Sequence, residues 1–514
     1  MIQAKPKFPV TTAMSVVVFL LSTVAMQLYW NKDHYFAMMK AKGSFVAIIT
    51  IACMLTFLTL GIERWSRRGY NIKRGDNIKK GVSGFSLLDW AVLLFGVSAI
   101  IVCLICPSPA KAFTGELGMM CGTLLYVTGT MVYFIVSRFM RPDKWILSLM
   151  MFVWAVIFLW AVLNQLGIDF FGLHENMRPG DIKMYIATIG NVNAAADSFC
   201  LTIPIGMVLY LFAEGKRLSR MLGLYVVLGL AAICFSHSEG SIFGMMFFIP
   251  FLVVMAFAQD RRTDRFLNLV LMFSSAVVFY HWTSVLKSWN NYSVLMTLSQ
   301  HYVGEIMLIL CIAVMMLRRT GRLQFTEKSR RITITVTSAI SLLVLVGVVS
   351  GCILYSLHHP AFGATRGAIW KGSFWTFRIH PLIYKIFGTG PGFYADNVTL
   401  AFSMLMGESE LRYATCHDSL LQALLGQGIF GLACLLTGVV ALVRCWCREL
   451  RGVATSPATL TDKNMPDILS LAALTGLICY FGCSLVESTY PHPITLLYAI
   501  LGLFRCAQLN ATRY

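Results

Sequence analysis

The residues of this chain that could do chemistry gather in one polar stretch, residues 357–417, between two strongly apolar runs. It contains Arg366, which cannot lose its charge, and His417, whose imidazole titrates near neutrality; such a pair can bind an anion and move a proton. Asp418 or Ser419 is expected to cap the helix that follows, so His417 would lie at a helix N-terminus, where anions are favoured. We therefore predict that Arg366 and His417 are catalytic residues.

Glycines and further cations complete the outline of an anion site. The segment from Phe387 to Tyr394 carries three glycines, whose N–H groups can approach a ligand closely because they lack a Cβ. The predicted substrate-binding residues of the stretch are Gly388, Gly390, Gly392, Lys371 and Arg378. Each feature alone has a simpler explanation, since an outer Arg commonly contacts lipid headgroups and a glycine cluster commonly forms a turn. Their joint occurrence favours a binding site.

Two other polar clusters interrupt apolar runs elsewhere in the chain. Asn191 and Asn193 precede three alanines, and Ser236, Ser238 and Glu239 lie in a tight turn between two runs. Asn side chains commonly link membrane helices, and Ser residues commonly cap helix ends, so structural roles stay open for both clusters. If the clusters meet the stretch 357–417, the three line one cavity with donors, cations and a base. All five residues are candidate substrate-binding residues on that basis.

The elements that must hold these residues are membrane helices. Of the 514 residues, 57% are apolar and only 13% are charged, and the mean hydropathy is +0.70. Stretches of about 18 or more apolar residues recur along the whole chain, and a soluble core could not bury them. A water-soluble enzyme of this size is excluded, and an all-α polytopic membrane protein is predicted.

The apolar runs predict about 14 transmembrane helices, within a range of 12 to 14. They are 9–29, 44–62, 85–106, 117–137, 146–167, 185–213, 222–238, 242–258, 266–286, 298–317, 332–357, 419–443, 469–486 and 494–507. The tenth contains His301 and Glu305, and the last is short and follows Pro493, so either is alternatively a re-entrant segment. The chain divides into N-terminal helices (1–184), a core that includes the loop 357–417 (185–443), and C-terminal helices (444–514).

The formal charge of +18 reflects basic residues that are distributed unevenly between the two sides of the predicted membrane, so it does not indicate nucleic-acid binding. When the basic residues are sorted by connection, 30 of the 42 fall on one side of the predicted membrane. Lys and Arg accumulate on the cytoplasmic side, so both termini are predicted to be cytoplasmic and the stretch 357–417 to lie outside. The first run follows Lys5 and Lys7 and lacks a cleavage pattern, which indicates a retained helix.

Two further patterns are assigned structural roles. The 15 cysteines lie mostly inside apolar runs, where Cys behaves as a small buried hydrophobe, and the closely spaced pairs have no His or acidic neighbours at metal-ligand spacing. Gly426, Gly428 and Gly431 match the dinucleotide-binding spacing GxGxxG, but they lie within an apolar run that follows no strand. We predict a close-packing helix face there.

The order of these motifs resembles the O-antigen ligase and O-antigen polymerase family of bacterial membrane glycosyltransferases. That family shows an Asn-containing helix, a Ser-rich turn between two central helices, and a long outer loop with an Arg before Ile/Trp, a glycine-rich stretch and a His-Asn or His-Asp pair. The matching positions are Asn191, Asn193, Ser236 to Ser241, Arg366 to Trp370, Gly388 to Phe393, and His417 with Asp418. The resemblance covers roughly residues 185–435. It departs at Glu239, where many relatives carry Arg.

The resemblance implies transfer of a glycan from a polyprenyl diphosphate to an acceptor hydroxyl, at the outer face of a bacterial cytoplasmic membrane and without cofactor or metal. Arg366 and its basic neighbours would stabilise charge on the diphosphate leaving group, and His417 would take the acceptor's proton. Apolar grooves between helices would hold the polyprenyl tail. The implied partners are the lipid-linked donor, a glycan or lipid acceptor, and membrane lipid.

Three functions stay open at this point. Polymerisation of a surface polysaccharide of the O-antigen type is favoured over ligation to lipid A-core, because Glu239 departs from the form of the turn associated with ligases. A flippase for lipid-linked oligosaccharides is the alternative from another class. A flippase predicts two-fold internal repetition and charges distributed within the helices, and the sequence shows neither clearly.

Overall fold

The computed structural model describes most of the chain. The described residues are 8–30, 34–74, 84–115, 120–175, 177–287, 293–359, 362–396, 398, 415–449, 452, 459–461 and 464–511. Within these ranges the chain is almost entirely helical, and its strands form one short hairpin.

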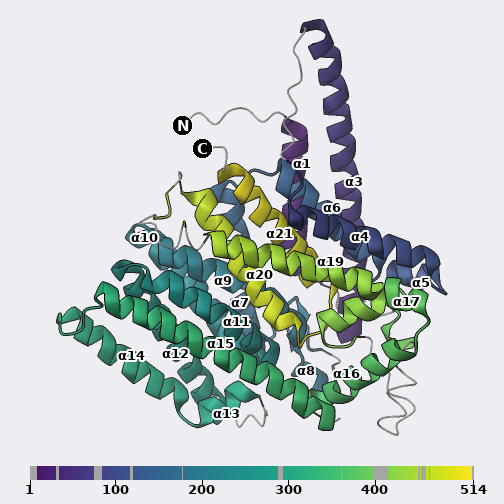
Figure 1. The fold of residues 1–514 in the computed structure, drawn as a ribbon. Coiled ribbons are helices and arrows are strands. Elements are labelled where there is room, and N and C mark those ends of the chain that lie inside the picture. Colours follow the sequence, from purple (N-terminus) through teal and green to yellow (C-terminus); the bar gives the residue numbers. More distant parts are fainter. Residues whose placement is uncertain are drawn as a thin grey trace.

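The helices follow one another in a single bundle (Figure 1). They are α1 (Pro9–Leu20), the π-helix η1 (Leu21–Ala25), α2 (Met26–Leu28), α3 (His34–Arg74), α4 (Leu87–Ile105), α5 (Pro109–Thr114), α6 (Thr123–Phe139), α7 (Lys144–Gln165), α8 (Pro179–Ile182), α9 (Val192–Phe212), α10 (Lys216–Ser236), α11 (Glu239–Phe257), α12 (Asp260–Leu286), α13 (Val294–Gln300), α14 (Val303–Arg319), α15 (Glu327–His358), α16 (Phe362–Ile379), α17 (Leu382–Phe387), α19 (Ser419–Glu449), α20 (Met465–Ser484) and α21 (Pro491–Ala511).

Twelve spans in the described residues are long and apolar enough to cross a membrane, and a thirteenth results if α13 and α14 cross as one. That pair is bent by 67°, next to Tyr302, whose φ of 57° a regular helix cannot contain. The apolar helix α6 has 17 residues and is shorter than the others. Each predicted run thus corresponds to a helix or to the bent pair, and the prediction of an all-α polytopic membrane protein is confirmed.

Two predicted boundaries are wrong. The run 185–213 begins as an antiparallel hairpin of β1 (Tyr185–Ile186) and β2 (Gly190–Asn191), and the helix starts only at Val192. Left-handed backbone at Ala187 (φ 47°) and Gly190 (φ 90°) makes this turn, and apolar content alone does not reveal it. The last run was predicted to begin at residue 494, but α21 begins at Pro491, because Pro lacks an N–H and fits the first helical turn, where an N–H would have no acceptor within the helix.

The predicted loop 357–417 is itself largely helical in its described part. It contains the end of α15, the whole of α16 and the short helix α17. Residues 360–361, 397 and 399–414 lie outside the described residues. The helices give Arg366 a rigid backbone, and the chain reaches Cys416 and His417 just before α19.

Helix α9 lies at the centre of the bundle. All of its residues except Asn193 are buried, as expected for a helix that is apolar on all sides. It packs closely against α20: a Cβ at Gly476 would lie 2.3 Å from the carbonyl oxygen of Leu201. Small residues at such contacts let helix backbones approach one another. The start of α9, which carries the two predicted Asn residues, is therefore held firmly by its neighbours.

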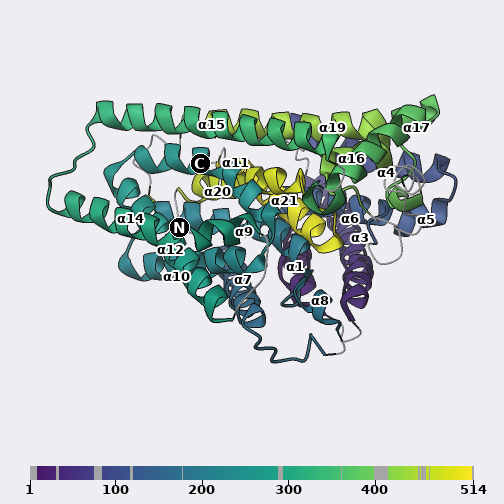
Figure 2. The same cartoon turned by 90° about the horizontal axis from the view of Figure 1, so that it is seen from below.

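Helix α15 lies at the periphery and packs against α11 and α16. Figure 2 shows it along one edge of the bundle, in line with α19. No residue in its most apolar window is buried, and Leu342 and Leu343 are 60% and 73% exposed. Apolar side chains that face outward over the length of a helix fit a lipid environment.

The two ends of the bundle differ. In Figure 1, α1 begins and α21 ends at the upper end, and α3 projects beyond the bundle there, whereas α8, α13 and α16 lie at the lower end. The start of α1 and the end of α21 thus lie toward one end of the bundle, and α16 lies toward the other.

Candidate functional site

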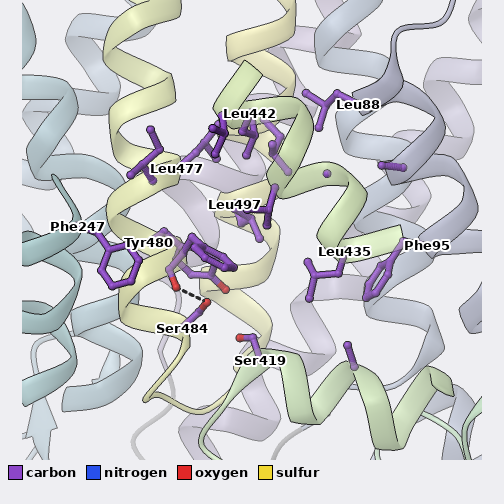
Figure 3. A pocket seen from close by; sticks show the side chains of 18 of the residues that line it. Leu88, Phe95, Phe247, Ser419, Leu435, Leu442, Leu477, Tyr480, Ser484 and Leu497 are labelled. Atoms are coloured by element: carbon purple, nitrogen blue, oxygen red, sulfur yellow. Dashed lines mark hydrogen bonds between the residues drawn. The ribbon is translucent and has the colours of Figure 1, made fainter. Parts of the chain in front are cut away.

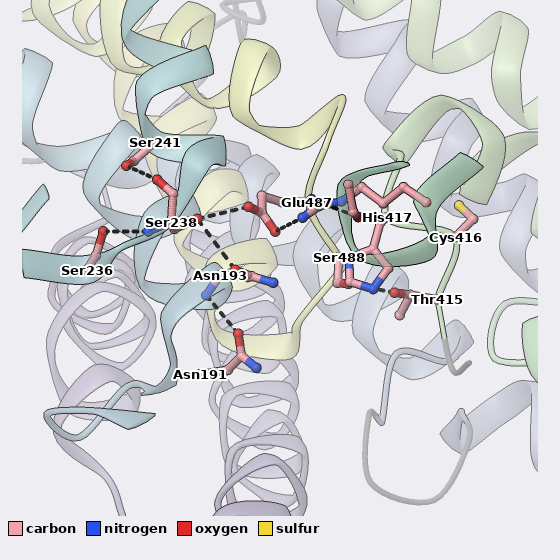
Figure 4. A network of polar contacts seen from close by, with 12 residues as sticks. Asn191, Asn193, Ser236, Ser238, Ser241, Thr415, Cys416, His417, Glu487 and Ser488 are labelled. Atoms are coloured by element: carbon pink, nitrogen blue, oxygen red, sulfur yellow. Dashed lines mark hydrogen bonds and ion pairs between the residues drawn. The ribbon is translucent and has the colours of Figure 1, made fainter. Parts of the chain in front are cut away.

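Five separate segments meet at the end of the bundle where α16 lies. They are the start of α9, the α10–α11 turn, α16, the residues before α19 and the α20–α21 connection. Figure 4 shows their polar side chains pointing toward one another. The three clusters singled out in the sequence thus lie together, and the α20–α21 connection, which sequence reasoning did not include, joins them.

The first part of this polar network links α9 to the α10–α11 turn. Asn191 caps α9, and its side-chain oxygen accepts a hydrogen bond from the N–H of Asn193 at 2.7 Å. The Ser238 hydroxyl lies 3.4 Å from Oδ1 of Asn193 and donates to Oε1 of Glu487 at 2.9 Å. Ser236 supports the same turn, because its Oγ accepts from the N–H of Ser238 at 3.4 Å. The predicted Asn and Ser clusters therefore meet at the Glu487 carboxyl group.

Glu487 connects these clusters to the predicted cation. Its carboxyl is 1% exposed, and Oε2 lies 3.6 Å from Nη2 of Arg366, whose side chain is 15% exposed. Burial raises the pKa of Glu487 to about 7, and the charge of Arg366 and the hydrogen bonds from Ser238 and the Gly240 backbone hold it below what burial alone would produce. A carboxyl group with a pKa near 7 can release or accept a proton at physiological pH.

His417 lies on the other side of Arg366. Its Nδ1 is 2.9 Å from the Ser488 hydroxyl, to which Thr415 donates a hydrogen bond at 2.6 Å. Burial, and then the positive charge of Arg366, lower the pKa of His417 to about 3. The imidazole is therefore neutral near pH 7.

Local contacts fix Arg366 and His417 relative to each other. Trp370 lies one turn after Arg366 on α16, and its indole N–H donates to the Cys416 carbonyl at 3.1 Å. Asp418 caps α19 by accepting from the N–H of Leu421 at 2.7 Å, so the predicted cap is confirmed. These contacts hold the two predicted catalytic residues at the junction of α16 and α19.

Left-handed backbone occurs three times around the network. Thr365 (φ 71°), which precedes Arg366, His417 itself (φ 52°) and His237 (φ 55°), at the end of α10, are non-glycine residues with positive φ. Such conformations cost energy and commonly occur where function requires a particular side-chain direction. Nδ1 of His237 lies 2.9 Å from the Tyr280 hydroxyl, which ties the turn to α12.

The glycine-rich stretch has a different environment from the one predicted. The N–H groups of Gly388 and Gly390 donate to the carbonyls of Tyr384 and Gly426, so they are not free to bind an anion. A Cβ at Gly388 would lie 2.4 Å from backbone atoms of Gly426. Gly428 has a φ of 68° and breaks α19 at this contact, and a Cβ there would lie 2.3 Å from the Ile386 carbonyl oxygen. The GxGxxG string is a close-packing face, as predicted.

Three predicted substrate-binding residues lie outside the polar network. Lys371 and Arg378 are exposed on α16, and Glu239 is exposed at the first position of α11. Gly392 has a φ of 89°, which fits a turn in the same glycine-rich stretch. The network therefore contains Arg366 as the cation of α16 and Glu487 as the carboxylate that lies closest to it.

Sequence reasoning missed Glu487, Ser488, Thr415 and Lys183. The predicted span 469–486 ended one residue before Glu487, which is a single acidic residue between two apolar runs. A lone charge at the edge of a membrane span is a signal that could have found it. Lys183 is exposed, but its charge, after burial, lowers the pKa of His237 to about 4. It adds a second positive charge near the network.

An apolar cavity begins beside the network and extends into the bundle. Its volume is about 570 Å³, and its walls come from α4, α6, α11, α15, α19, α20 and α21. Figure 3 shows Ser419 and Ser484 toward one end and Leu88 and Leu442 toward the other. Ser419 is two residues after His417, and Thr489, which also lines the cavity, follows Ser488 directly. The cavity lining and the polar network thus share two chain segments, the start of α19 and the connection before α21.

Among the described residues, no group of three or more His, Cys, Asp or Glu side chains could hold a metal ion. Neither a protein-family model nor a curated protein matches this chain. The similarity to the O-antigen ligase and polymerase family therefore stays a prediction from the motifs. The fold and the site define the class that can be stated plainly: an all-α, multi-pass membrane protein with a buried polar network at one end of its helices.

Proposed function

We propose that this protein is a membrane glycosyltransferase, which transfers a polyprenyl-diphosphate-linked glycan to an acceptor hydroxyl on the outer face of a bacterial cytoplasmic membrane. The observation that carries the proposal is the pairing of a cation-bearing polar network with an apolar cavity of about 570 Å³ whose lining includes Ser419 and Thr489, close neighbours in the chain of His417 and Ser488. A lipid diphosphate needs this combination, because its head is anionic and its tail is apolar. The volume falls within the range of about 300–1,000 Å³ that is usual for ligand sites.

Helix ends support an anionic head at the network. Asn191 caps α9, Ser238 is the N-cap residue of α11, and Asp418 caps α19. The N-terminal ends of these helices carry partial positive charge and favour anions. Together with Arg366 they offer a diphosphate several fixed positive ends in a region that is partly shielded from water.

The residues suggest how transfer proceeds. The acceptor oxygen attacks the anomeric carbon, the bond from this carbon to the diphosphate breaks, and the leaving diphosphate takes the bonding electrons. Arg366 stabilises the charge that develops there, and preorganised donors of this kind contribute about 10²–10³-fold in rate. The proton of the acceptor hydroxyl goes to a base in the same network. His417 is the candidate predicted from the sequence, and Glu487 is a second group at the same place.

The test is chain growth in membranes supplied with a lipid-linked repeat unit. We expect Arg366→Ala and His417→Ala membranes to stop making longer glycan while the proteins still insert normally. Arg331→Ala is the matched control, because Arg331 is 79% exposed and pairs only with an exposed Glu327 one turn away. Chain growth at the wild-type rate in both site variants would end the proposal.

Polymerisation of a surface polysaccharide is the form of the reaction that we favour. In this form the acceptor is a second glycan, and ligation to lipid A-core is the alternative. Glu239, which replaces the Arg of many relatives, is exposed at the α10–α11 turn, so the turn offers an acidic group where a ligase would offer a cation. Defined acceptors presented to the purified protein separate the two reactions.

A further inference from the structure

One oxygen of Glu487 lacks a hydrogen-bond donor although the residue is almost fully buried. Oε1 accepts from Ser238, but Oε2 has no hydrogen-bond partner among the residues that the structure describes, and the guanidinium of Arg366 is 3.6 Å away from it. A buried polar atom left unpaired costs about 1–3 kcal/mol. Such atoms are few in folded proteins, and each one calls for an explanation, of which a bound partner is one.

Arg366 shows the complementary feature. Its Nε is also buried and has no hydrogen-bond partner in the described part of the chain, while Nη1 donates to the Gly363 carbonyl at 3.3 Å. An unused donor and an unused acceptor thus lie on neighbouring side chains. A ligand that has an anionic oxygen next to a hydroxyl group satisfies both atoms at once. The two reactants of a glycan transfer present these two groups where the diphosphate meets the attacking hydroxyl.

His417 is less suited than Glu487 to accept the proton. The Ser488 hydroxyl lies 2.9 Å from Nδ1 and 3.3 Å from Nε2 of His417, so the ring already has a hydroxyl partner from the protein whichever nitrogen of the neutral ring is the acceptor. A proton added to the ring would also bring a second positive charge close to Arg366. Glu487 has neither disadvantage, since the charge of Arg366 stabilises its ionised form.

We propose that Glu487 is the catalytic base: its Oε2 accepts the proton of the acceptor hydroxyl as this oxygen bonds to the anomeric carbon. The inference rests on the proposed glycan transfer. The carboxylate becomes a carboxylic acid, the diphosphate leaves with the electron pair of the broken bond, and the proton passes to water when the products depart. His417 then acts as a positioning residue, held by Ser488 beside the diphosphate.

The contact between Arg366 and Glu487 also makes the basicity of Glu487 depend on binding of the lipid-diphosphate donor. The charge of Arg366 acts on both Glu487 and His417, and it opposes the burial that raises the pKa of Glu487. When a diphosphate neutralises that charge, the opposition weakens, so the ionised carboxylate is a stronger base while a smaller fraction of the group is ionised near pH 7. The other titratable groups facing Glu487 are Asp197 and Cys200 from α9 and Cys483 from α20. Glu487 therefore becomes most basic when the donor is in place.

The test compares purified wild type with Glu487→Gln, Glu487→Asp and the control Glu327→Gln. Gln keeps the length of the side chain and an oxygen for Ser238 but cannot serve as the base, and Glu327 is an exposed Glu at the start of α15 (80% exposed). The readouts are turnover with a polyprenyl-diphosphate-linked glycan, binding of that donor, and turnover against pH. Thermal unfolding reports whether each variant is folded.

We expect Glu487→Gln to lose about 10²–10⁴-fold in turnover, the usual contribution of a general base, with donor binding within about threefold of wild type. The wild type should lose activity as the pH falls, and this acid limb should be absent from the residual activity of Glu487→Gln. Turnover of folded Glu487→Gln within about threefold of wild type, or a loss confined to donor binding, would overturn the assignment. Failure of the wild type to transfer glycan would instead overturn the proposed function.

Glu487→Asp covers the case in which Glu487→Gln does not fold. Asp keeps an ionisable carboxyl, so this variant should retain the acid limb at a reduced rate, because its oxygens lie farther from the acceptor. An acid limb missing from the wild type itself, or from folded Glu487→Asp, would overturn the assignment. The control Glu327→Gln should match the wild type in every readout.

Discussion

Two buried carboxylates, one toward each end of the helix bundle, differ in how completely they are paired. Asp89, near the start of α4, receives hydrogen bonds from Ser86 and Tyr133 and forms ion pairs with Arg138 at 2.8 Å and Arg505 at 3.3 Å. Both of its oxygens are satisfied. Glu487 has one satisfied oxygen, and its other oxygen faces a single guanidinium at 3.6 Å.

This difference separates a structural role from a functional one. The Asp89 cluster joins α4, α6 and α21, and its partners come entirely from the protein. A buried charge that is fully paired holds helices in place, whereas one that is partly paired is expensive unless a ligand completes it. The contrast identifies the Glu487 end as the place where a ligand is expected.

The largest expected effect on stability comes from Asp89→Asn. The substitution leaves Arg138 and Arg505 without a carboxylate, and breaking a buried pair costs about 3–5 kcal/mol. Thermal unfolding in detergent measures the loss, and turnover per folded molecule should change little. Asp396→Asn is the control, because Asp396 is 41% exposed and pairs with Lys111 at the surface. An unfolding temperature of Asp89→Asn equal to that of the wild type would show that the ion pairs of Asp89 do not stabilise the fold.

Gly388→Ala tests whether the glycine-rich stretch, whose N–H groups already donate to carbonyls of the protein, has a structural role. Its φ of 85° disfavours a side chain, and the new Cβ would lie 2.4 Å from Gly426, so we expect a loss of about 1–3 kcal/mol in stability. Donor binding by the folded fraction should persist. Gly347→Ala on α15, where a Cβ meets nothing within 4 Å, is the control. Loss of donor binding without loss of stability would restore the glycine stretch as a phosphate site.

The pH dependence of the unfolding temperature tests whether the Glu487 carboxyl is incompletely paired in the folded state. Because the pKa of Glu487 is raised from 4.5 to about 7, the folded state binds more protons than the unfolded state between these values. Its contribution to stability is therefore complete below about pH 4.5 and is lost as the pH rises through about 7. Unfolding temperatures of wild type minus Glu487→Gln should fall across this window. A difference that rises with pH would show that the carboxylate is fully paired in the folded state.

The smallest effects are expected for Lys371→Ala and Arg378→Ala. Both residues are exposed on α16, and exposed charges contribute little in water. We expect turnover within about threefold of wild type, and a larger fall only at low ionic strength, where a surface charge attracts an anionic donor more strongly. Losses comparable to that of Arg366→Ala would extend the site along α16.

The sequence predicted the fold well because membrane helices are encoded by local composition. Each apolar run became a helix or the bent pair, whereas the hairpin before α9 depended on backbone turns at Ala187 and Gly190, which apolar content does not register. Arg366, His417, Asn193 and Ser238 were found because they are polar residues near the ends of apolar runs. Glu487 was missed because its partners come from α11 and α16, and only the tertiary structure brings them together.

The most direct measurement is the stoichiometry of the reaction. The purified protein is supplied with a polyprenyl-diphosphate-linked glycan and a defined acceptor, in the absence of nucleotide sugars and added metal. We expect one polyprenyl diphosphate released for each glycosidic bond formed. A protein that moves the intact lipid-linked glycan across a vesicle membrane without releasing any diphosphate would contradict the glycosyltransferase account.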